Sequence, residues 1–191
     1  RTTPEGAVFD VTGLAGDISG VKLPMFGPHN VLNALAAFAA AQALSLPAST
    51  VAVALAQFSG VKRRFTTTGI VDGVTVVDDY GHHPVEIRAV LKAGRDAIGA
   101  REGRVIAVMQ PHRYSRLAAL FDDFCASFAD ADEIIIADVY AAGEQPIEGV
   151  TSDAMVAGMK ARGHRSAQVI AGPDALADAL AAVAQPGDMV V

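Results

Sequence analysis

The chain has 191 residues, a formal net charge of −6 at pH 7 and a mean hydropathy of +0.33, and 51% of its residues are hydrophobic. These values predict a folded protein with a sizeable core, and the negative charge argues against a general nucleic-acid binder. No apolar run is long enough to cross a membrane, and the single cysteine, Cys125, is expected to be a buried thiol in a reducing compartment.

The first 59 residues are predicted to form a unit of short strands and two helices. Residues 7–23 contain β-type runs separated by Gly and Asp, which suggests a hairpin or strand ends. An Ala-rich run predicts a buried helix over residues 30–46, stopped by Pro47, and residues 48–50 are expected to cap a second helix that ends near residue 58. The basic segment GVKRRF then marks the boundary between residues 1–59 and residues 60–191.

Strands and helices alternate through the rest of the chain. The dipeptide Asp72-Gly73 predicts a hairpin between strands over 64–71 and 74–78. The elements expected after it are a helix over 84–98, a strand over 104–109, a helix over 115–129, a strand over 133–139, a helix over 151–162, a strand over 167–170, a helix over 173–184 and a last strand from Asp188. This alternation predicts an α/β fold, a Rossmann-like and mostly parallel sheet with helices on both faces.

A first polar cluster, VVDDYGHHP at residues 76–84, lies where an expected strand ends and a helix begins at Pro84. Ligands of open α/β sheets bind outside the carboxyl ends of the strands, so this turn is a candidate site. Asp78 and Asp79 alternate along the strand, so one can meet a ligand while the other bonds the turn. Of His82 and His83, which could bind phosphate or a metal ion, one is expected to be structural.

A second polar cluster, QPHRYSR at residues 110–116, follows the next strand along the chain. Ser115 is expected to cap the following helix, and Arg113 and Arg116 are three residues apart, so they can point the same way. Two guanidinium groups and free backbone N–H groups at a helix start suit a carboxylate or a phosphate. Because both clusters are expected one strand apart at the same sheet edge, a functional site is favoured over a solvated loop.

Two further clusters carry weaker signals. Asn30 and Asn33 share a helix face in FGPHNVLNALAA, and an amide can pair with an adenine edge; the alternative is a helix cap with a mid-helix polar residue. The cations of GVKRRF can reach a nucleotide phosphate, or they form a solvated connector.

Taken in order, GPHNVLNALAA, GVKRRF, DDYGHHPVEI and QPHRYSR resemble the Mur ligases, the ATP-dependent amino-acid ligases of peptidoglycan precursor synthesis. The resemblance covers nearly all of the chain, and its motifs are similar to those of the members that join L-alanine to UDP-N-acetylmuramate. One alternative is the ligase that recycles murein tripeptide, whose turn usually has Phe and Ala in place of Tyr80 and Gly81. The other is a non-catalytic nucleotide-binding or ligand-binding module.

The resemblance implies that residues 1–59 are the end of a central ATP-binding domain and that residues 60–191 are most of a C-terminal Rossmann-like domain. The sequence contains no GxxxxGK[ST] motif. The family's P-loop and its Mg²⁺-binding residues are therefore expected upstream, with no metal ligand in this chain. On this basis the chain by itself is expected to be inactive.

The resemblance also implies roles for individual residues in a cytoplasmic enzyme with no nucleic-acid or membrane partner. The residues expected to contact ATP are His29, Asn30, Asn33, Arg64 and Asp79. Those expected to bind the substrates are Tyr80, His112, Arg113 and Arg116, and those expected to act in catalysis are His82, Arg113 and Arg116. In the implied reaction a muramyl carboxylate attacks the γ-phosphate of ATP, and the amine of L-alanine then attacks the acyl phosphate.

Overall fold

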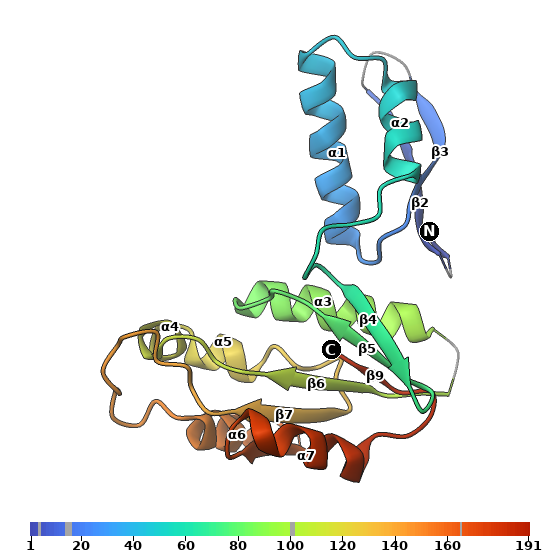
Figure 1. Ribbon diagram of the computed structural model, residues 1–191. Helices are drawn as coiled ribbons and strands as arrows, with labels where there is room; N and C mark the ends of the chain where they lie inside the picture. The colour runs from blue at the N-terminus through green and yellow to red at the C-terminus, as the bar shows by residue number, and fades with distance from the viewer. Residues whose placement is uncertain (4, 14–16, 100–101, 165) are drawn as a thin grey trace. The chain divides into compact units, whose positions relative to one another are not determined.

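The computed structural model describes residues 1–191 except 4, 14–16, 100–101 and 165 (Figure 1). The chain forms two compact units, Arg1–Thr66 and Thr67–Val191, and each is described by itself. The basic segment before Thr66 belongs to the N-terminal unit: the amide of Arg64 donates to the carbonyl of Val61, and the ring of Phe65 lies 5.8 Å from that of Phe26.

The N-terminal unit is an antiparallel sheet with two helices. Its elements are β1 (Thr2–Thr3), β2 (Gly6–Val11), β3 (Ile18–Leu23), α1 (Pro28–Ala43) and α2 (Ala48–Ala56), in the sheet order β1-β2-β3. Val11, Val21 and Phe38 form its buried core, against which Val51 and Leu55 of α2 pack. The pairing of β2 with β3 confirms the predicted hairpin, while residues 14–16 of the predicted segment lie outside the described residues.

Helix α1 was predicted to be buried, and this is wrong for half of its surface. It buries Asn30, Ala34, Phe38 and Ala41, whereas Leu32 and Leu35 are 66% and 36% exposed. The physical reason is size, because one small sheet and one neighbouring helix can cover only a single stripe of a helix.

The C-terminal unit is built on a six-stranded sheet. Its strands are β4 (Thr66–Val71), β5 (Val74–Asp78), β6 (Val105–Met109), β7 (Glu133–Ala137), β8 (Ala167–Ile170) and β9 (Met189–Val190), in the order β4-β5-β9-β6-β7-β8. All pairings from β5 to β8 are parallel. Asp72 and Gly73, with φ of 49° and 81°, turn the chain between β4 and β5, so the predicted hairpin and the mostly parallel sheet are confirmed.

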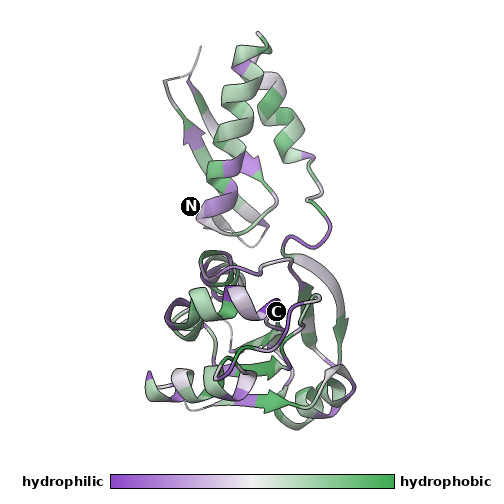
Figure 2. Ribbon diagram, turned by 90° about the vertical axis from the view of Figure 1, so that its left-hand side faces the viewer, coloured by the Kyte–Doolittle hydropathy of each residue, from purple (hydrophilic) through white to green (hydrophobic). Residues whose placement is uncertain are grey.

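Helices cover both faces of this sheet, as predicted. They are α3 (Pro84–Ile98), α4 (Tyr114–Ala119), α5 (Phe121–Cys125), α6 (Ser152–Ala161) and α7 (Leu176–Val183), the last preceded by the short 3-10 helix η1 (Pro173–Ala175). Along β6, Ile106 and Val108 join the apolar cluster of α7, whereas Val105 faces Gly94 of α3. Such double coverage explains why the central strands are apolar throughout (Figure 2).

Three details of the predicted helices are wrong. The helix expected over residues 115–129 is split into α4 and α5 at Leu120, whose φ of −125° and ψ of 24° leave the helical region, and α5 ends at Cys125. The helix expected from residue 173 begins as a 3-10 turn. Finally, the cap predicted at residues 48–50 is wrong, because these residues lie inside α2, which begins directly after its N-cap Pro47 and has no side-chain cap.

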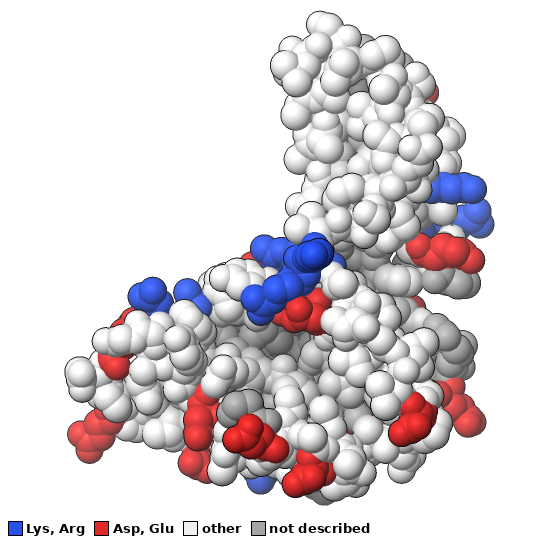
Figure 3. Space-filling view, in the orientation of Figure 1, with Lys and Arg blue, Asp and Glu red and all other residues white. Residues whose placement is uncertain are grey.

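Among the described residues, no helix combines the length and the apolar composition needed to cross a membrane. On the face drawn in Figure 3, acidic side chains are spread over the C-terminal unit and cationic side chains occur in small groups.

Candidate functional site

The turn after β5 is held by two carboxylates. Asp79 Oδ1 accepts a hydrogen bond from the amide of Gly81 at 2.6 Å, which closes an Asx-type turn. Glu86 Oε2, from the first turn of α3, accepts from the amides of His82 and His83 at 3.0 and 3.1 Å. The side chains of this turn are therefore presented on a well-supported backbone at the carboxyl end of the strand.

The two histidines of the turn have different environments. His83 is the N-cap of α3, where its Nδ1 accepts from the amide of Val85 at 3.3 Å and completes a capping box with Glu86. His82 Nδ1 lies 3.1 Å from the carbonyl oxygen of Tyr80. Because a carbonyl can only accept, this nitrogen is the donor in that hydrogen bond. His83 thus has the structural role that the sequence assigned to one of the pair.

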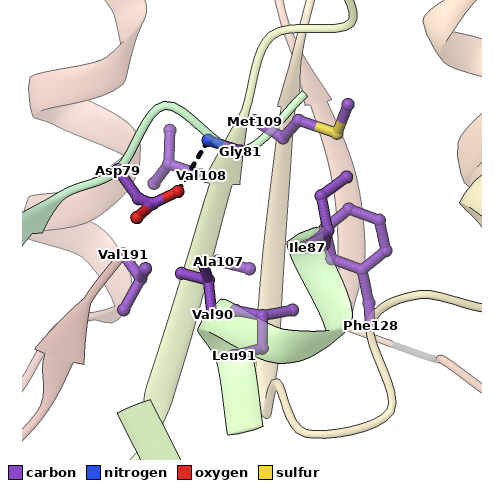
Figure 4. Close-up of a pocket in the computed structure, with 10 residues that line it drawn as sticks. All are labelled: Asp79, Gly81, Ile87, Val90, Leu91, Ala107, Val108, Met109, Phe128 and Val191. Carbon is purple, nitrogen blue, oxygen red and sulfur yellow. Dashed lines mark hydrogen bonds between the residues drawn. The ribbon is translucent and has the colours of Figure 1, made fainter. Parts of the chain in front are cut away.

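A cavity of about 60 Å³ lies beneath this turn (Figure 4). Asp79 and Gly81 line it together with Ile87 of α3, Met109 at the end of β6 and Val191 after β9. Residues of the first polar turn and Met109, which directly precedes the second polar turn, therefore line the same cavity. Ligand pockets for drug-sized molecules measure about 300–1,000 Å³, so this cavity is far too small to enclose a nucleotide.

The prediction that the two polar turns follow neighbouring strands is wrong. Strand β9 pairs with β5 through Thr75 and Met189 and with β6 through Val105 and Met189, so it lies between them. After β8 the chain runs back through α7, and β9 then pairs between β5 and β6. The two turns therefore flank the end of β9 at the carboxyl edge.

The second turn, after β6, has an unusual backbone. Arg113 has φ 75° and ψ 128°, a conformation that costs a non-glycine residue about 1–3 kcal/mol. Two backbone hydrogen bonds brace it, from the amide of Arg113 to the carbonyl of Tyr140 and from the amide of Tyr140 to the carbonyl of Pro111, both at 2.8 Å. The rings of His112 and Tyr140 stack with centroids 5.2 Å apart. The loop after β7 therefore supports the turn after β6.

Helix α4 is not capped by Ser115 as predicted. Its N-cap is Arg113, and the polar partner comes from Glu144, whose Oε2 and Oε1 accept from the amide and hydroxyl of Ser115 at 2.9 and 2.7 Å. These hydrogen bonds hold the pKa of the Glu144 carboxyl below its usual value, with a smaller contribution from Arg113. The expectation of free N–H groups at this helix start is therefore wrong for Ser115.

The arginines of this turn remain accessible to different degrees. The Arg113 side chain is 49% exposed, with Nη1 3.6 Å from Glu144 Oε1. Arg116 is partly buried, and its Nη1 donates to the carbonyl of His112 at 3.4 Å. Sequence reasoning missed Tyr140 and Glu144. The signal that could have found them is their place after the next parallel strand, at the same edge of the sheet.

The remaining predicted nucleotide contacts belong to the N-terminal unit. Asn30 is 8% exposed; its Nδ2 donates to the carbonyl of Phe26 at 2.8 Å, and its Oδ1 accepts from Asn33 at 3.3 Å. The side chain of Asn30 thus bonds to the segment before α1, but Asn30 lies inside the helix and the N-cap is Gly27, so the predicted asparagine cap is wrong. Nucleotide contacts by Asn30, Asn33, His29 and Arg64 stay predictions.

Known proteins match nearly all of the chain. A UDP-N-acetylmuramate–L-alanine ligase of Rhodospirillum centenum is 56% identical over 192 residues, which cover 97% of this chain and 39% of that protein. A protein of the same name from Xanthobacter autotrophicus is 59% identical over 175 residues, which cover 92% and 37%. The chain therefore spans about two-fifths of the length of the curated relatives it matches.

Solved structures show the same likeness. A UDP-N-acetylmuramate-alanine ligase from Thermotoga maritima matches with a TM-score of 0.71 and 26% identity over 92% of this chain and 36% of that one. A murein peptide ligase from Psychrobacter arcticus matches with a TM-score of 0.65 and 27% identity over 90% and 35%. In sequence, residues 63–191 match the family described as Mur ligase, glutamate ligase domain. The chain therefore belongs to the Mur ligase family.

Proposed function

We propose that the chain is part of a cytoplasmic ligase that joins L-alanine to UDP-N-acetylmuramate at the expense of ATP, in peptidoglycan precursor synthesis. The observation that carries this proposal is the 54–59% identity, over almost the whole chain, to proteins named UDP-N-acetylmuramate–L-alanine ligase. In this proposal residues 1–59 are the end of the central ATP-binding domain, and residues 60–191 form the domain that receives the amino acid.

The proposed reaction has two steps. A carboxylate of UDP-N-acetylmuramate attacks the γ-phosphate of ATP and ADP leaves; the amine of L-alanine then attacks the acyl carbon and phosphate leaves. Chemistry of this kind depends mainly on positioning and on neutralising negative charge. A site built from arginine, histidine and tyrosine at a sheet edge, without a protein nucleophile, suits that requirement.

The second turn is proposed to hold the amino acid. The guanidinium of Arg113 is half-exposed beside the end of β6, where it can bind a carboxylate through two parallel hydrogen bonds. Arg116 and His112 would contact the muramyl side of the reacting group. Together these side chains would orient the two substrates, and the arginines would offset the charge that develops between them.

The first turn is proposed to face the nucleotide. Asp79 would accept hydrogen bonds from ribose hydroxyls, and Tyr80 and His82 would face the nucleotide and the reacting carboxylate. The small cavity beneath the turn has no room for ATP, so the nucleotide would lie over the turn. In the N-terminal unit, His29, Asn30 and Asn33 would lie beside adenine, and Arg64 would reach the phosphates.

Mg²⁺ is the metal expected with ATP in this chemistry. Across the described part of the chain, no three His, Cys, Asp or Glu residues lie close enough together to hold a metal ion. In this proposal, as the family resemblance implies, the Mg²⁺ ligands lie mainly in the part of the protein upstream of this chain, and no step of the mechanism is placed on the metal.

A coupled assay of phosphate release tests the proposal. The full-length protein that contains this chain, supplied with ATP and UDP-N-acetylmuramate, is expected to release phosphate when L-alanine is added. Release that requires murein tripeptide in place of free L-alanine would overturn the substrate assignment in favour of the recycling ligase. Because the sequence has no P-loop motif, residues 1–191 alone are expected to show no turnover in the same assay.

A further inference from the structure

We propose that Glu144 is a positioning residue that holds Arg113 in the conformation in which it binds the incoming amino acid. The inference rests on the proposed function, in which Arg113 meets the carboxylate of L-alanine. Glu144 itself need not contact substrate. Its place is the loop after β7, 31 residues along the chain from Arg113, and only the fold brings the two together.

The backbone of Arg113 is strained. Its φ of 75° lies in the region that L-residues rarely adopt, and an arginine gains nothing locally from that conformation. Such a conformation persists only where surrounding contacts over-determine it. Here the contacts come from one loop: Tyr140 provides the backbone pairing to Arg113 and Pro111, and Glu144 provides the side-chain contacts.

Glu144 is placed to act on both sides of the strained residue. On the helix side, its carboxylate accepts two hydrogen bonds from Ser115, which fixes the first turn of α4 directly after Arg113. On the side-chain side, Oε1 lies 3.6 Å from Nη1 of Arg113. Glu144 is itself fixed by a tight turn, in which its amide donates to the carbonyl of Ala141 at 3.0 Å.

The same geometry keeps Arg113 available to a ligand. Ser115 donates to both oxygens of the Glu144 carboxylate, so Glu144 is not arranged to clamp the guanidinium bidentately. A separation of 3.6 Å is too long for a strong hydrogen bond, and the Arg113 side chain stays 49% exposed. Glu144 thus orients the guanidinium by its charge while the planar fork can still bind a substrate carboxylate.

Steady-state kinetics of the full-length enzyme provide the first test. Glu144→Ala is expected to raise KM for L-alanine at least tenfold, with KM for ATP and for UDP-N-acetylmuramate within twofold of the unmodified enzyme. Glu144→Gln can still accept one hydrogen bond from Ser115, so a smaller rise of about threefold is expected. Asp122→Asn, which removes the charge of an 87% exposed carboxylate on α5, is the matched control and should leave all three constants unchanged.

A double-mutant cycle asks whether Glu144 acts through Arg113. If it does, Glu144→Ala should change KM for L-alanine less than twofold once Arg113→Ala is already present. An undiminished tenfold effect in that background would overturn the proposal, because Glu144 would then act by another route. Equal increases in the three KM values would also overturn it, since general loosening of the protein affects every substrate.

Hydrogen–deuterium exchange of the same full-length variants separates this inference from the proposed function. Glu144→Ala should speed amide exchange in residues 111–117 and 138–144 and leave exchange in α3 and β5 unchanged. If Glu144→Ala speeds exchange throughout the protein, the milder variant Glu144→Gln is measured in its place. Unchanged exchange in residues 111–117 would overturn the positioning role whatever the activity. If the unmodified full-length protein does not ligate L-alanine but exchange in the variants changes as expected, the proposed function is overturned. The finding that Glu144 stabilises this turn would then still stand.

Discussion

At the scale of single residues, neighbouring identical side chains acquire different roles from their surroundings. His83 caps α3 through Nδ1, while His82 turns the same atom to the carbonyl of Tyr80. The sequence predicted that one histidine would be structural but could not say which, because the difference depends on where α3 begins. The carboxylate of Glu86, which accepts from both backbone amides, sets that point.

Replacement of Arg113 is predicted to lower activity. Replacing it with alanine in the full-length protein would remove the proposed charge-assisted contact to a substrate carboxylate, so kcat/KM for L-alanine should fall at least tenfold, or about 1.4 kcal/mol. Steady-state kinetics with varied L-alanine measure the change. Arg88→Ala, at an exposed position of α3, is the matched control. Unchanged kinetics for Arg113→Ala would remove it from the site.

Replacement of Glu86 is predicted to lower the stability of the protein. Glu86→Ala leaves the amides of His82 and His83 without their acceptor and breaks the capping box, which should cost about 1–2 kcal/mol in free energy of unfolding. Urea denaturation measures this loss. Glu86→Gln retains an amide oxygen as acceptor and should lose less than half as much, so equal losses for the two variants would contradict the capping role.

At the scale of helices and strands, close packing decides at which helix positions glycine leaves room for a larger side chain. Helix α6 packs against α5 through Gly158, where an added Cβ would lie 2.7 Å from Cys125 Sγ and 3.4 Å from the ring of Phe121. Burial raises the pKa of the Cys125 thiol, as expected for an inert core residue. By contrast, an added Cβ at Gly94 of α3 would meet its nearest neighbours, Val191 and Met189, at 3.5–3.6 Å.

These two glycines form a matched pair of predictions. Gly158→Ala should destabilise the protein by about 1–3 kcal/mol, because its Cβ overpacks a buried contact. Gly94→Ala should be neutral or stabilising by up to about 1 kcal/mol, because alanine is the better helix former and its Cβ fits. Thermal or urea unfolding measures both. Adding Cys125→Ala should restore much of the loss in Gly158→Ala; failure to do so would show that the sulfur is not the obstacle.

At the scale of the whole C-terminal unit, one buried carboxylate ties the inserted strand to its neighbours. Asp188, 3% exposed, precedes β9 and accepts hydrogen bonds from the backbone and guanidinium of Arg104 and from the amide of Gln185. Arg104 also donates to the carbonyl of Val183 at the end of α7. The network therefore joins the start of β6, the end of α7 and the start of β9.

The pH dependence of unfolding tests this network. Burial raises the pKa of Asp188, but the hydrogen bonds from Arg104 and Gln185 outweigh it and hold that pKa below its ordinary value of 3.8. A lowered folded-state pKa means that the stabilisation is present above the unfolded-state pKa and is lost as pH falls through the folded-state value. Asp188→Asn should therefore cost about 2–3 kcal/mol at pH 7, and the difference should shrink below about pH 4. A pH-independent difference in urea unfolding would contradict the assignment.

The sequence by itself determined the fold class, the hairpin at Asp72-Gly73, the start of α3 at Pro84 and the position of both polar turns after strands, because each depends on neighbouring residues. Apolar strands that alternate with helices favour a parallel sheet whose strands are covered on both faces. Only the tertiary structure decided that β9 lies between the two turns and that Glu144 lies against Ser115 and Arg113. These outcomes depend on contacts between residues about 30 or more positions apart, and local periodicity says nothing about which distant loops meet.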